Sequence, residues 1–249
     1  MAIYSEYDPF ARVYNRHWGD HFIPLSFPIL ESQVFNRIPP EASILDLCCG
    51  TGQLDQLLTN RGYQVTGLDG SEEMLRFARE NAPAAEFILA DARSFRLPDT
   101  YHAVISTFDS LNHIMELDEL TAVFCNVHAA LRPGGLFLFD LNMESGYGST
   151  WKDNFNVLEE DLACFIRSSY RPEERIACFE ATIFHLEEGG WRRSDFTLKQ
   201  RCYSETEILS ALAEAGFPEI QACAGNLYKE LIPLTGDTER GFFVCRKAR

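Results

Sequence analysis

The segment SILDLCCGTGQLDQLL, residues 43–58, places an acid and a glycine turn at the end of a short apolar run. Asp46 lies near the end of that run, and Gly50 and Gly52 precede an amphipathic stretch. Glycine allows a tight turn and a close approach of the backbone to a ligand. Asp69, about 20 residues further on, ends the next apolar run, where an acid hydrogen-bonds ribose hydroxyls. These residues predict a nucleoside-binding turn.

Three kinds of ligand fit such a turn: a phosphate-bearing cofactor, a metal held by the cysteines, or a small molecule that carries its own charge. Cys48 and Cys49 are adjacent on a strand end, so their side chains point to opposite faces and cannot chelate one ion together. We predict no metal site. The dinucleotide fingerprint G-x-G-x-x-G breaks at Asp55, which replaces the third glycine. Asp46 would repel a pyrophosphate but attract an ammonium group. The pattern therefore favours a cationic ligand over NAD.

The elements that must position these residues alternate between strand and helix from residue 41 to 145. The central strands are continuously apolar, which is typical of a parallel sheet covered on both faces. We predict an α/β fold with a doubly wound, mostly parallel seven-stranded sheet. The expected strands are residues 43–47, 63–69, 85–91, 101–107, 136–142, 220–225 and 241–247.

Two further segments stand apart from this alternation. Residues 1–40 are helical and aromatic in pattern and end at two prolines, which predicts an N-terminal helical cap. From about residue 155 to residue 203 apolar and polar residues alternate, which predicts a small antiparallel β insertion, residues 146–203, after the fifth strand. We predict that the insertion is a substrate lid, with a dimerisation surface as the alternative. The α/β core then comprises residues 41–145 and 204–249.

The composition limits the possible partners. The formal net charge is −15, from 37 acids and 22 bases. A net negative charge opposes binding to nucleic acid or to an anionic membrane surface. No stretch approaches the ~20 apolar residues of a membrane-spanning helix, and the N-terminus lacks the layout of a signal peptide. We therefore expect a cytoplasmic protein that binds neither nucleic acid nor membrane, as a monomer or a homodimer.

Four motifs, ILDLCCGTGQL, GLDGSEEML, ADARSF and FDSLNHI, resemble the successive motifs of class I S-adenosylmethionine-dependent methyltransferases. The resemblance is strong over residues 40–142 and looser elsewhere. It implies a Rossmann-like fold, S-adenosylmethionine as cofactor with S-adenosylhomocysteine as product, and methyl transfer to a small-molecule acceptor. A non-catalytic, cofactor-binding regulatory subunit is the alternative.

The resemblance also implies roles for particular residues. The methionine portion of the cofactor is expected at the first motif, the ribose at Asp69, and the adenine at Asp91 and the backbone of Ala92. Phe108 is expected beneath the reactive end. The full set of expected cofactor-binding residues is Tyr14, Asp46, Cys48, Gly50, Thr51, Gly52, Asp69, Gly70, Met74, Asp91, Ala92 and Phe108.

Methyl transfer to an amine or hydroxyl requires a base after the fourth strand, where the methyl group would point. His113 in FDSLNHI is placed there, and imidazole titrates near neutral pH. The segment DSLNH is similar to S-x-I-G-H of amino-sugar N-methyltransferases, and ARVYN, with Tyr14, is similar to their AELYD. We predict His113 and Tyr14 as catalytic, with Tyr14 chiefly shielding the cofactor, and a nitrogen acceptor over an oxygen one. A structural role for His113 is the alternative.

Overall fold

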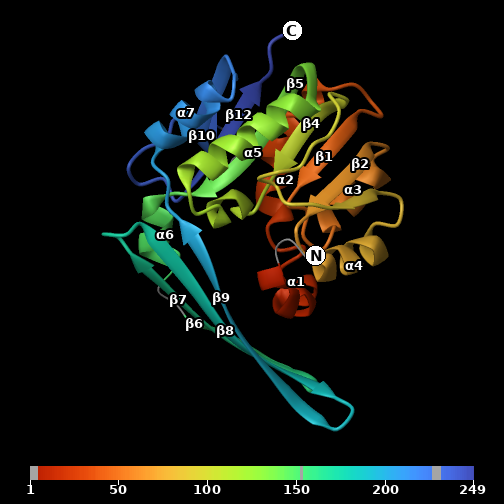
Figure 1. The fold of residues 1–249 in the computed structure, drawn as a ribbon, viewed down its shortest axis with the longest axis vertical. Coiled ribbons are helices and arrows are strands. Elements are labelled where there is room, and N and C mark those ends of the chain that lie inside the picture. The colour runs from red at the N-terminus through yellow and green to blue at the C-terminus, as the bar shows by residue number, and fades with distance from the viewer. Residues whose placement is uncertain (1–4, 152–153, 226–230) are drawn as a thin grey trace.

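The main sheet of the computed structural model, which describes residues 5–151, 154–225 and 231–249, lies between two layers of helices (Figure 1). The strands from β5 to β3 run parallel, while β12, β10 and β11 are antiparallel to their neighbours. The predicted doubly wound, mostly parallel sheet of seven strands is confirmed. Among the described residues an eighth, β11, extends it; two residues are too few to leave an alternation pattern in the sequence. The order is β11 (Leu231–Ile232), β10 (Glu219–Gly225), β12 (Arg240–Arg246), β5 (Leu131–Asn142), β4 (Tyr101–Ser106), β1 (Ser43–Leu47), β2 (Gln64–Asp69) and β3 (Glu86–Leu89).

The strand order reverses between β1 and β4, which lie side by side. In open α/β sheets, ligands bind beyond the carboxyl ends of the strands at such a switch point. The arrowheads of the parallel strands in Figure 1 point toward α1 (Ala11–His17) and α4 (Glu72–Asn81). The fold therefore brings the acid-bearing strand ends and the N-terminal segment to the place where a ligand is expected.

Both faces of the sheet are buried, which is why its strands are continuously apolar. On β1, Ile44 packs in a cluster with apolar residues of α2 and α3. The next residue, Leu45, points to the opposite face and packs with residues of α5 and α7. The four helices are α2 (Ile23–Gln33), α3 (Gln53–Asn60), α5 (Leu117–Ala130) and α7 (Glu205–Glu214).

Several shorter helices lie between these elements along the chain. No helix in the described part of the chain is long and apolar enough to cross a membrane. The remaining short elements are η1 (Ser5–Phe10), η2 (Phe35–Arg37), η3 (Ser110–His113) and α6 (Glu144–Thr150).

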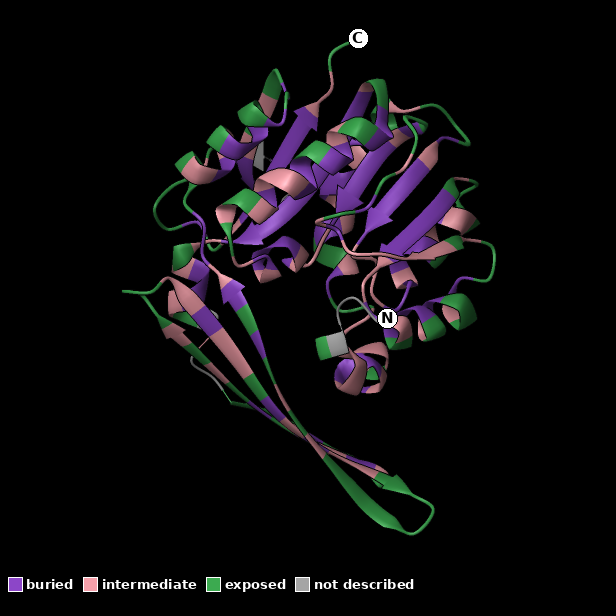
Figure 2. Ribbon diagram, viewed as in Figure 1, coloured by how far each residue is buried: buried purple, intermediate pink, exposed green. Residues whose placement is uncertain are grey.

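A second, separate sheet forms the predicted antiparallel insertion. It projects from the body as a narrow arm whose outer hairpin is exposed (Figure 2). Closer to the body, Phe10 and Val13 pack against Ile166 and Ile183 of this sheet. Its use as a lid stays a prediction, as do the three domain ranges. The strands follow in chain order as β6 (Asn154–Leu158), β7 (Leu162–Arg171), β8 (Ile176–Glu187) and β9 (Gly190–Arg201).

Local sequence signals set where two helices begin. The hydroxyl of Ser71, the residue before α4, accepts a hydrogen bond from the backbone N–H of Met74 at 3.1 Å. Ser204 and Glu207 form a capping box at the start of α7, each side chain bonding the other residue's backbone N–H. Each cap satisfies N–H groups that the first helical turn leaves without partners.

The turn between β1 and α3 requires glycine at position 52. Gly52 has φ of 80°, a left-handed conformation, and precedes the first residue of α3. A Cβ at this position would lie 2.9 Å from the Cα of Ala78 on α4. The turn therefore fixes both the path into α3 and the close approach of α4.

We expect Gly52→Ala to lower the free energy of unfolding by about 3 kcal/mol, from left-handed backbone strain and from overpacking against α4. Gly62→Ala is the matched control, because Gly62 has φ of 90° but nothing within 4 Å of an added Cβ. That variant should lose only about 1 kcal/mol. Urea denaturation of both variants measures the difference, and equal losses would show that the contact with α4 is unimportant.

Candidate active site

Two cavities lie at the carboxyl ends of the strands. The first spans ≈ 770 Å³ and the second ≈ 860 Å³, with the solvent at their mouths included. Four residues line both cavities: Tyr7, Tyr14, Phe108 and His113. These four residues, from η1, α1, the loop after β4 and η3, form the junction between the cavities.

The first cavity contains most of the residues predicted from the sequence. They come from α1, the ends of β1 and β2, the first turn of α4, and the segments that follow β3 and β4. The fold thus brings together positions that are far apart in the chain. The predicted residues that line this cavity are Tyr14, Cys48, Gly50, Asp69, Gly70, Met74, Asp91, Ala92, Phe108 and His113.

Three predicted residues do not line the first cavity. Asp46 lines a third, smaller cavity of ≈ 390 Å³ that also touches Tyr14 and Phe108. Thr51 is fully buried, and its carbonyl accepts a hydrogen bond from the Asn81 amide at 2.7 Å. Gly52 lies at the contact with α4. For Thr51 and Gly52 the structure therefore shows a role in shaping the turn, and direct contact with a ligand stays a prediction.

Asp69 is fixed at the end of β2 by backbone N–H groups. Its carboxylate accepts hydrogen bonds from Gly50 and from Ser71, each at 2.9 Å. Burial raises the pKa of Asp69, while these bonds and one from Gly70 oppose the shift. The carboxylate is an acceptor with lone pairs beyond those two bonds, so it suits the paired hydroxyls of a ribose.

Asp91 forms an ion pair with Arg93, a residue that was not predicted from the sequence. Arg93 lines the same cavity, and one guanidinium nitrogen lies 2.6 Å from the Asp91 carboxylate. Burial acts to raise the pKa of Asp91, but the hydrogen bonds and charge of Arg93 outweigh it, so the pKa is lowered. Arg93 stands two residues after Asp91 in ADARSF. This short spacing is the feature of the sequence from which the ion pair could have been predicted.

A pair of buried acids lies behind the glycine turn. Burial raises the pKa of Asp46 well above its ordinary value, with further contributions from the charges of Asp55 and Asp69. Burial likewise raises the pKa of Asp55 to about 8. Neither carboxylate oxygen of Asp55 has a hydrogen-bond partner. A cation placed against Asp46 would therefore stabilise a negative charge that the protein itself leaves poorly compensated.

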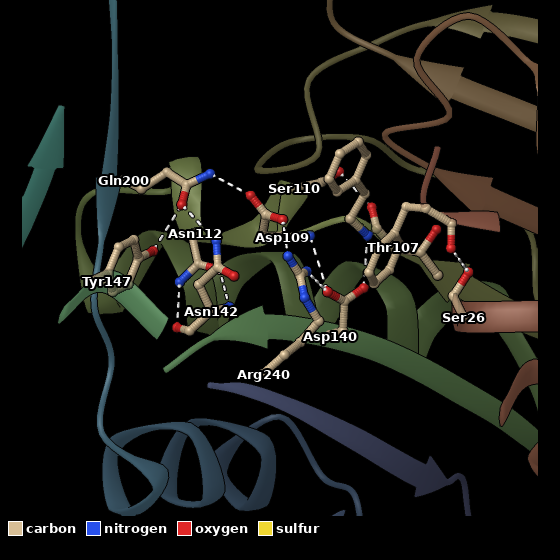
Figure 3. A network of polar contacts seen from close by, with 12 residues as sticks. Ser26, Thr107, Asp109, Ser110, Asn112, Asp140, Asn142, Tyr147, Gln200 and Arg240 are labelled. Atoms are coloured by element: carbon tan, nitrogen blue, oxygen red, sulfur yellow. Dashed lines mark hydrogen bonds and ion pairs between the residues drawn. The ribbon is translucent and has the colours of Figure 1, made fainter. Parts of the chain in front are cut away.

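The second cavity rests on a buried ion cluster (Figure 3). Asp140, fully buried at the end of β5, accepts hydrogen bonds from the backbone N–H groups of Phe108 at 2.7 Å and Asp109 at 3.1 Å. These two residues have φ of 65° and 51°, a left-handed pair whose N–H groups converge on one anion. Arg240, on β12, pairs with Asp140 and with Asp109, the latter at 2.7 Å.

The cluster extends to the inserted sheet through Gln200 of β9. The Gln200 amide donates to Asp109 at 2.6 Å, and its carbonyl oxygen accepts from the Tyr147 hydroxyl at 2.8 Å. The sequence reasoning missed Asp140, Arg240 and Gln200. These three residues could have been found as polar residues within or beside apolar strands. In LFLFDLN, for example, one acid, Asp140, interrupts an apolar run.

His113 sits at the junction with all its hydrogen-bonding positions engaged. Its Nε2 lies 2.6 Å from the Tyr7 hydroxyl and 3.1 Å from the Gln200 amide nitrogen, and its Nδ1 lies 2.8 Å from the Lys199 carbonyl oxygen. Burial lowers the pKa of His113, although Asp109 and the Lys199 carbonyl oppose the shift. The imidazole is therefore neutral at pH 7.

Within the described residues, no group of three or more His, Cys, Asp or Glu side chains is arranged to hold a metal ion. The charged and aromatic groups that line the two cavities are carboxylates, aromatic rings, one neutral imidazole and two arginines, Arg93 and Arg240, that are already paired with carboxylates. This arrangement can hold a nucleoside with a cationic tail beside a second small molecule, and it can accept a proton at the junction.

Comparison with known proteins identifies relatives of this chain. Residues 44–135 match the family model described as "Methyltransferase domain". The chain is 36% identical over 214 residues to dTDP-3-amino-3,4,6-trideoxy-alpha-D-glucopyranose N,N-dimethyltransferase of Streptomyces venezuelae, with 85% of each chain covered. It is 29% identical over 217 residues to putative methyltransferase YqeM of Bacillus subtilis (strain 168), covering 85% of this chain and 87% of that one. The solved structure of S-adenosylmethionine-bound CalS10, an amino pentose methyltransferase from Micromonospora echinaspora, matches with a TM-score of 0.70 at 25% identity over 96% of each chain.

We expect Arg240→Met to lower the free energy of unfolding by about 3–5 kcal/mol at pH 7.5, because it leaves buried carboxylates without their cation. Burial already raises the pKa of Asp140, and without Arg240 it should rise further. The folded protein then takes up a proton as the pH falls, so the deficit should shrink by pH 5.5.

The matched control is Arg76→Met, because Arg76 is half exposed on α4 and pairs with Glu73 at 3.0 Å. This variant should lose less than about 1 kcal/mol at either pH. Urea denaturation at the two pH values provides the comparison. A deficit in Arg240→Met that does not depend on pH would argue against the buried carboxylates as its cause.

Proposed function

We propose that this chain, which belongs to the class I S-adenosylmethionine-dependent methyltransferases, transfers a methyl group to the nitrogen atom of a small molecule bound in the second cavity. The observation that carries the proposal is the junction of the two cavities at Tyr7, Tyr14, Phe108 and His113. A direct displacement requires donor and acceptor to be held in line, and two adjoining cavities supply that arrangement. Bound S-adenosylmethionine supplies an activated methyl group on a sulfonium.

The chemistry of the first cavity supports a donor that carries positive charge. Asp69 would hold the ribose and Asp91 the adenine amino group, with the ammonium of the methionine portion directed toward Asp46. The one guanidinium among the described lining residues, Arg93, is already paired with Asp91. Such a cavity complements a sulfonium and an ammonium, and it offers no unpaired cation for a pyrophosphate.

Two observations support a nitrogen atom as the methyl acceptor: the imidazole at the junction of the cavities, and the names of the relatives. A neutral imidazole at the methyl-transfer point can remove the proton that an amine must lose. The Streptomyces venezuelae relative is named as an N,N-dimethyltransferase of an amino sugar, and CalS10 as an amino pentose methyltransferase. Both names support an amine as the acceptor of this chain.

The second cavity has a wall suited to the body of such an acceptor. Aromatic side chains from the N-terminal segment, α6's end and β8 surround it, and the ion cluster forms its floor. We propose that the inserted sheet acts as a lid over this cavity, because β8 and β9 contribute directly to its wall. The aromatic residues are Phe10, Trp18, Trp151 and Phe179, and the contributions of β9 are Leu198 and Gln200.

The Asp69→Ala variant tests the donor site. Wild-type protein should bind S-adenosylmethionine and S-adenosylhomocysteine but not NAD. The variant should bind the two sulfur ligands at least about 100-fold more weakly, because the two ribose hydroxyls lose the charged acceptor to which they donate. Isothermal titration calorimetry measures the three affinities. Asp99→Ala, on an exposed loop, is the control and should bind like wild type. Tight NAD binding by wild type would contradict the proposed cofactor.

Donor binding should release protons, because burial raises the pKa of Asp46 in the ligand-free protein and an adjacent ammonium would lower it again. The affinity for S-adenosylhomocysteine should therefore rise with pH between the lower pKa of Asp46 in the complex and its raised pKa in the ligand-free protein. The rise should be up to roughly tenfold per pH unit for one proton. Calorimetry in buffers of different ionisation enthalpy detects the release. 5′-Methylthioadenosine, which keeps the nucleoside but lacks the ammonium, is the control and should release fewer protons. Equal release by the two ligands would exclude Asp46 as the ammonium partner.

A further inference from the structure

We propose that Arg93 makes the first cavity select adenine over a 6-oxopurine, because it holds Asp91 as a carboxylate that can only accept a hydrogen bond from the ligand. This inference rests on the proposed function, in which Asp91 meets the adenine amino group. Both residues line the first cavity, in the segment that follows β3. Arg93 is thus a positioning residue, which would act on the cofactor through Asp91.

The guanidinium of Arg93 binds both carboxylate oxygens of Asp91. Its Nε lies 3.0 Å from Oδ1 and 3.1 Å from Oδ2, and its Nη2 donates to Oδ2 at 2.6 Å. The Arg93 backbone N–H also donates to Oδ1, at 2.8 Å. Charge-assisted bonds to both oxygens fix the plane of a carboxylate and favour its ionised form. Arg93 therefore determines both the orientation and the charge of Asp91.

These bonds leave one oxygen of Asp91 with the greater capacity to accept from a ligand. Each carboxylate oxygen has about two lone pairs. Oδ1 accepts from the backbone N–H and from Nε, which uses both, whereas Oδ2 accepts one short bond and only part of the Nε bond. The Asp91 side chain is 10% exposed and lines the cavity. We therefore assign Oδ2 as the acceptor for the exocyclic amino group.

The helix α5 holds the rest of this segment in place. The Nη1 of Arg93 donates to the Glu119 carboxylate at 3.2 Å, on the side of the guanidinium away from Asp91. The carbonyl of Ala92 accepts from the Asn126 amide at 3.1 Å. The carboxylate and the backbone beside it thus have a fixed position relative to one helix, which is what a selective contact requires.

The two purines present opposite patterns to such a contact. Adenine has an amino donor at C6 beside an acceptor at N1, whereas hypoxanthine has an oxygen acceptor at C6 beside an N–H donor at N1. An ionised Asp91 facing O6 would bring two acceptors together, and a desolvated acceptor without a donor lowers affinity. A protonated Asp91 would lose this selectivity, because its O–H could donate to O6.

Without Arg93 the surroundings would favour that protonated form. Burial acts to raise the pKa of Asp91, and the hydrogen bonds and charge of Arg93 reverse the shift. The other groups near the pair supply no positive charge. Cys48, at the end of β1, is an uncharged thiol because burial raises its pKa well above the ordinary value, and Glu119 is an acid. The ionisation of Asp91 therefore depends on Arg93.

Calorimetric titration with S-adenosylhomocysteine and its deaminated analogue S-inosylhomocysteine, between pH 5.5 and 8, tests the proposal. Wild type should bind the adenine ligand at least about 100-fold more tightly than the inosine ligand throughout. In Arg93→Met this ratio should fall at least about tenfold, and it should fall further as the pH decreases, because the raised pKa of Asp91 lets it take up a proton. Both ligands carry the same ammonium, so titration of Asp46 cancels in the ratio.

Two further variants separate selection from a merely structural role. Arg93→Lys keeps the charge but not the planar fork, so it should retain more of the ratio than Arg93→Met. Arg61→Met is the control, because Arg61 is half exposed and pairs with Glu31 at 2.9 Å, away from the cavity. It should keep the wild-type ratio at every pH. Equal weakening of both ligands in Arg93→Met, with an unchanged ratio, overturns the proposal.

The wild-type protein distinguishes this failure from that of the proposed function. If wild type binds neither nucleoside ligand, the proposed cofactor is wrong, and the selection falls with it. If wild type binds both ligands equally tightly, the cofactor stands and the selection of adenine through Asp91 and Arg93 is overturned.

Discussion

The buried ion cluster of Asp140, Arg240 and Asp109 is the interaction on which the rest of the site depends. Burying an ion costs several kcal/mol unless charges and hydrogen bonds compensate it, so each member requires the others. Asp140 is on β5, Arg240 on β12, and Asp109 in the loop after β4. The guanidinium also lies 4.4 Å from the centroid of the Phe22 ring, which stacks on Phe108 at 5.0 Å. The cluster thus joins the sheet to the junction between the cavities.

The same cluster explains how a strained loop is kept at the centre of the site. Phe108 and Asp109 both adopt left-handed backbone conformations, which cost of order 1–3 kcal/mol each for residues other than glycine. Two hydrogen bonds to the Asp140 carboxylate offset that cost. Asp109 then reaches Gln200 on β9, and Gln200 reaches His113. The inserted sheet and the imidazole are therefore coupled at two points of β9, the Gln200 side chain and the Lys199 carbonyl.

The parts of this structure that could be predicted from the sequence are those set by nearby residues. The turn after β1 and the acid at the end of β2 both follow from short-range spacing, and continuous apolar runs predicted a sheet covered on both faces. The ion cluster could not be predicted, because Arg240 and Asp140 are separated by 100 positions and meet only through the pairing of β12 with β5. Tyr7 was missed for the same reason, since it reaches His113 across 106 positions.

The charges of the site also suit the direction in which charge moves during the proposed reaction. Methyl transfer from a sulfonium to an amine creates no net charge; a positive charge leaves sulfur, reaches nitrogen and is finally carried by the proton on His113. The ion cluster has two carboxylates and one guanidinium, which gives it one formal net negative charge beside the second cavity. Because the cluster is held rigid by its own hydrogen bonds, it stabilises the moving charge without reorganising. In the proposed function, the buried acids of the cluster would act on the acceptor side as Asp46 and Asp69 would act on the donor side.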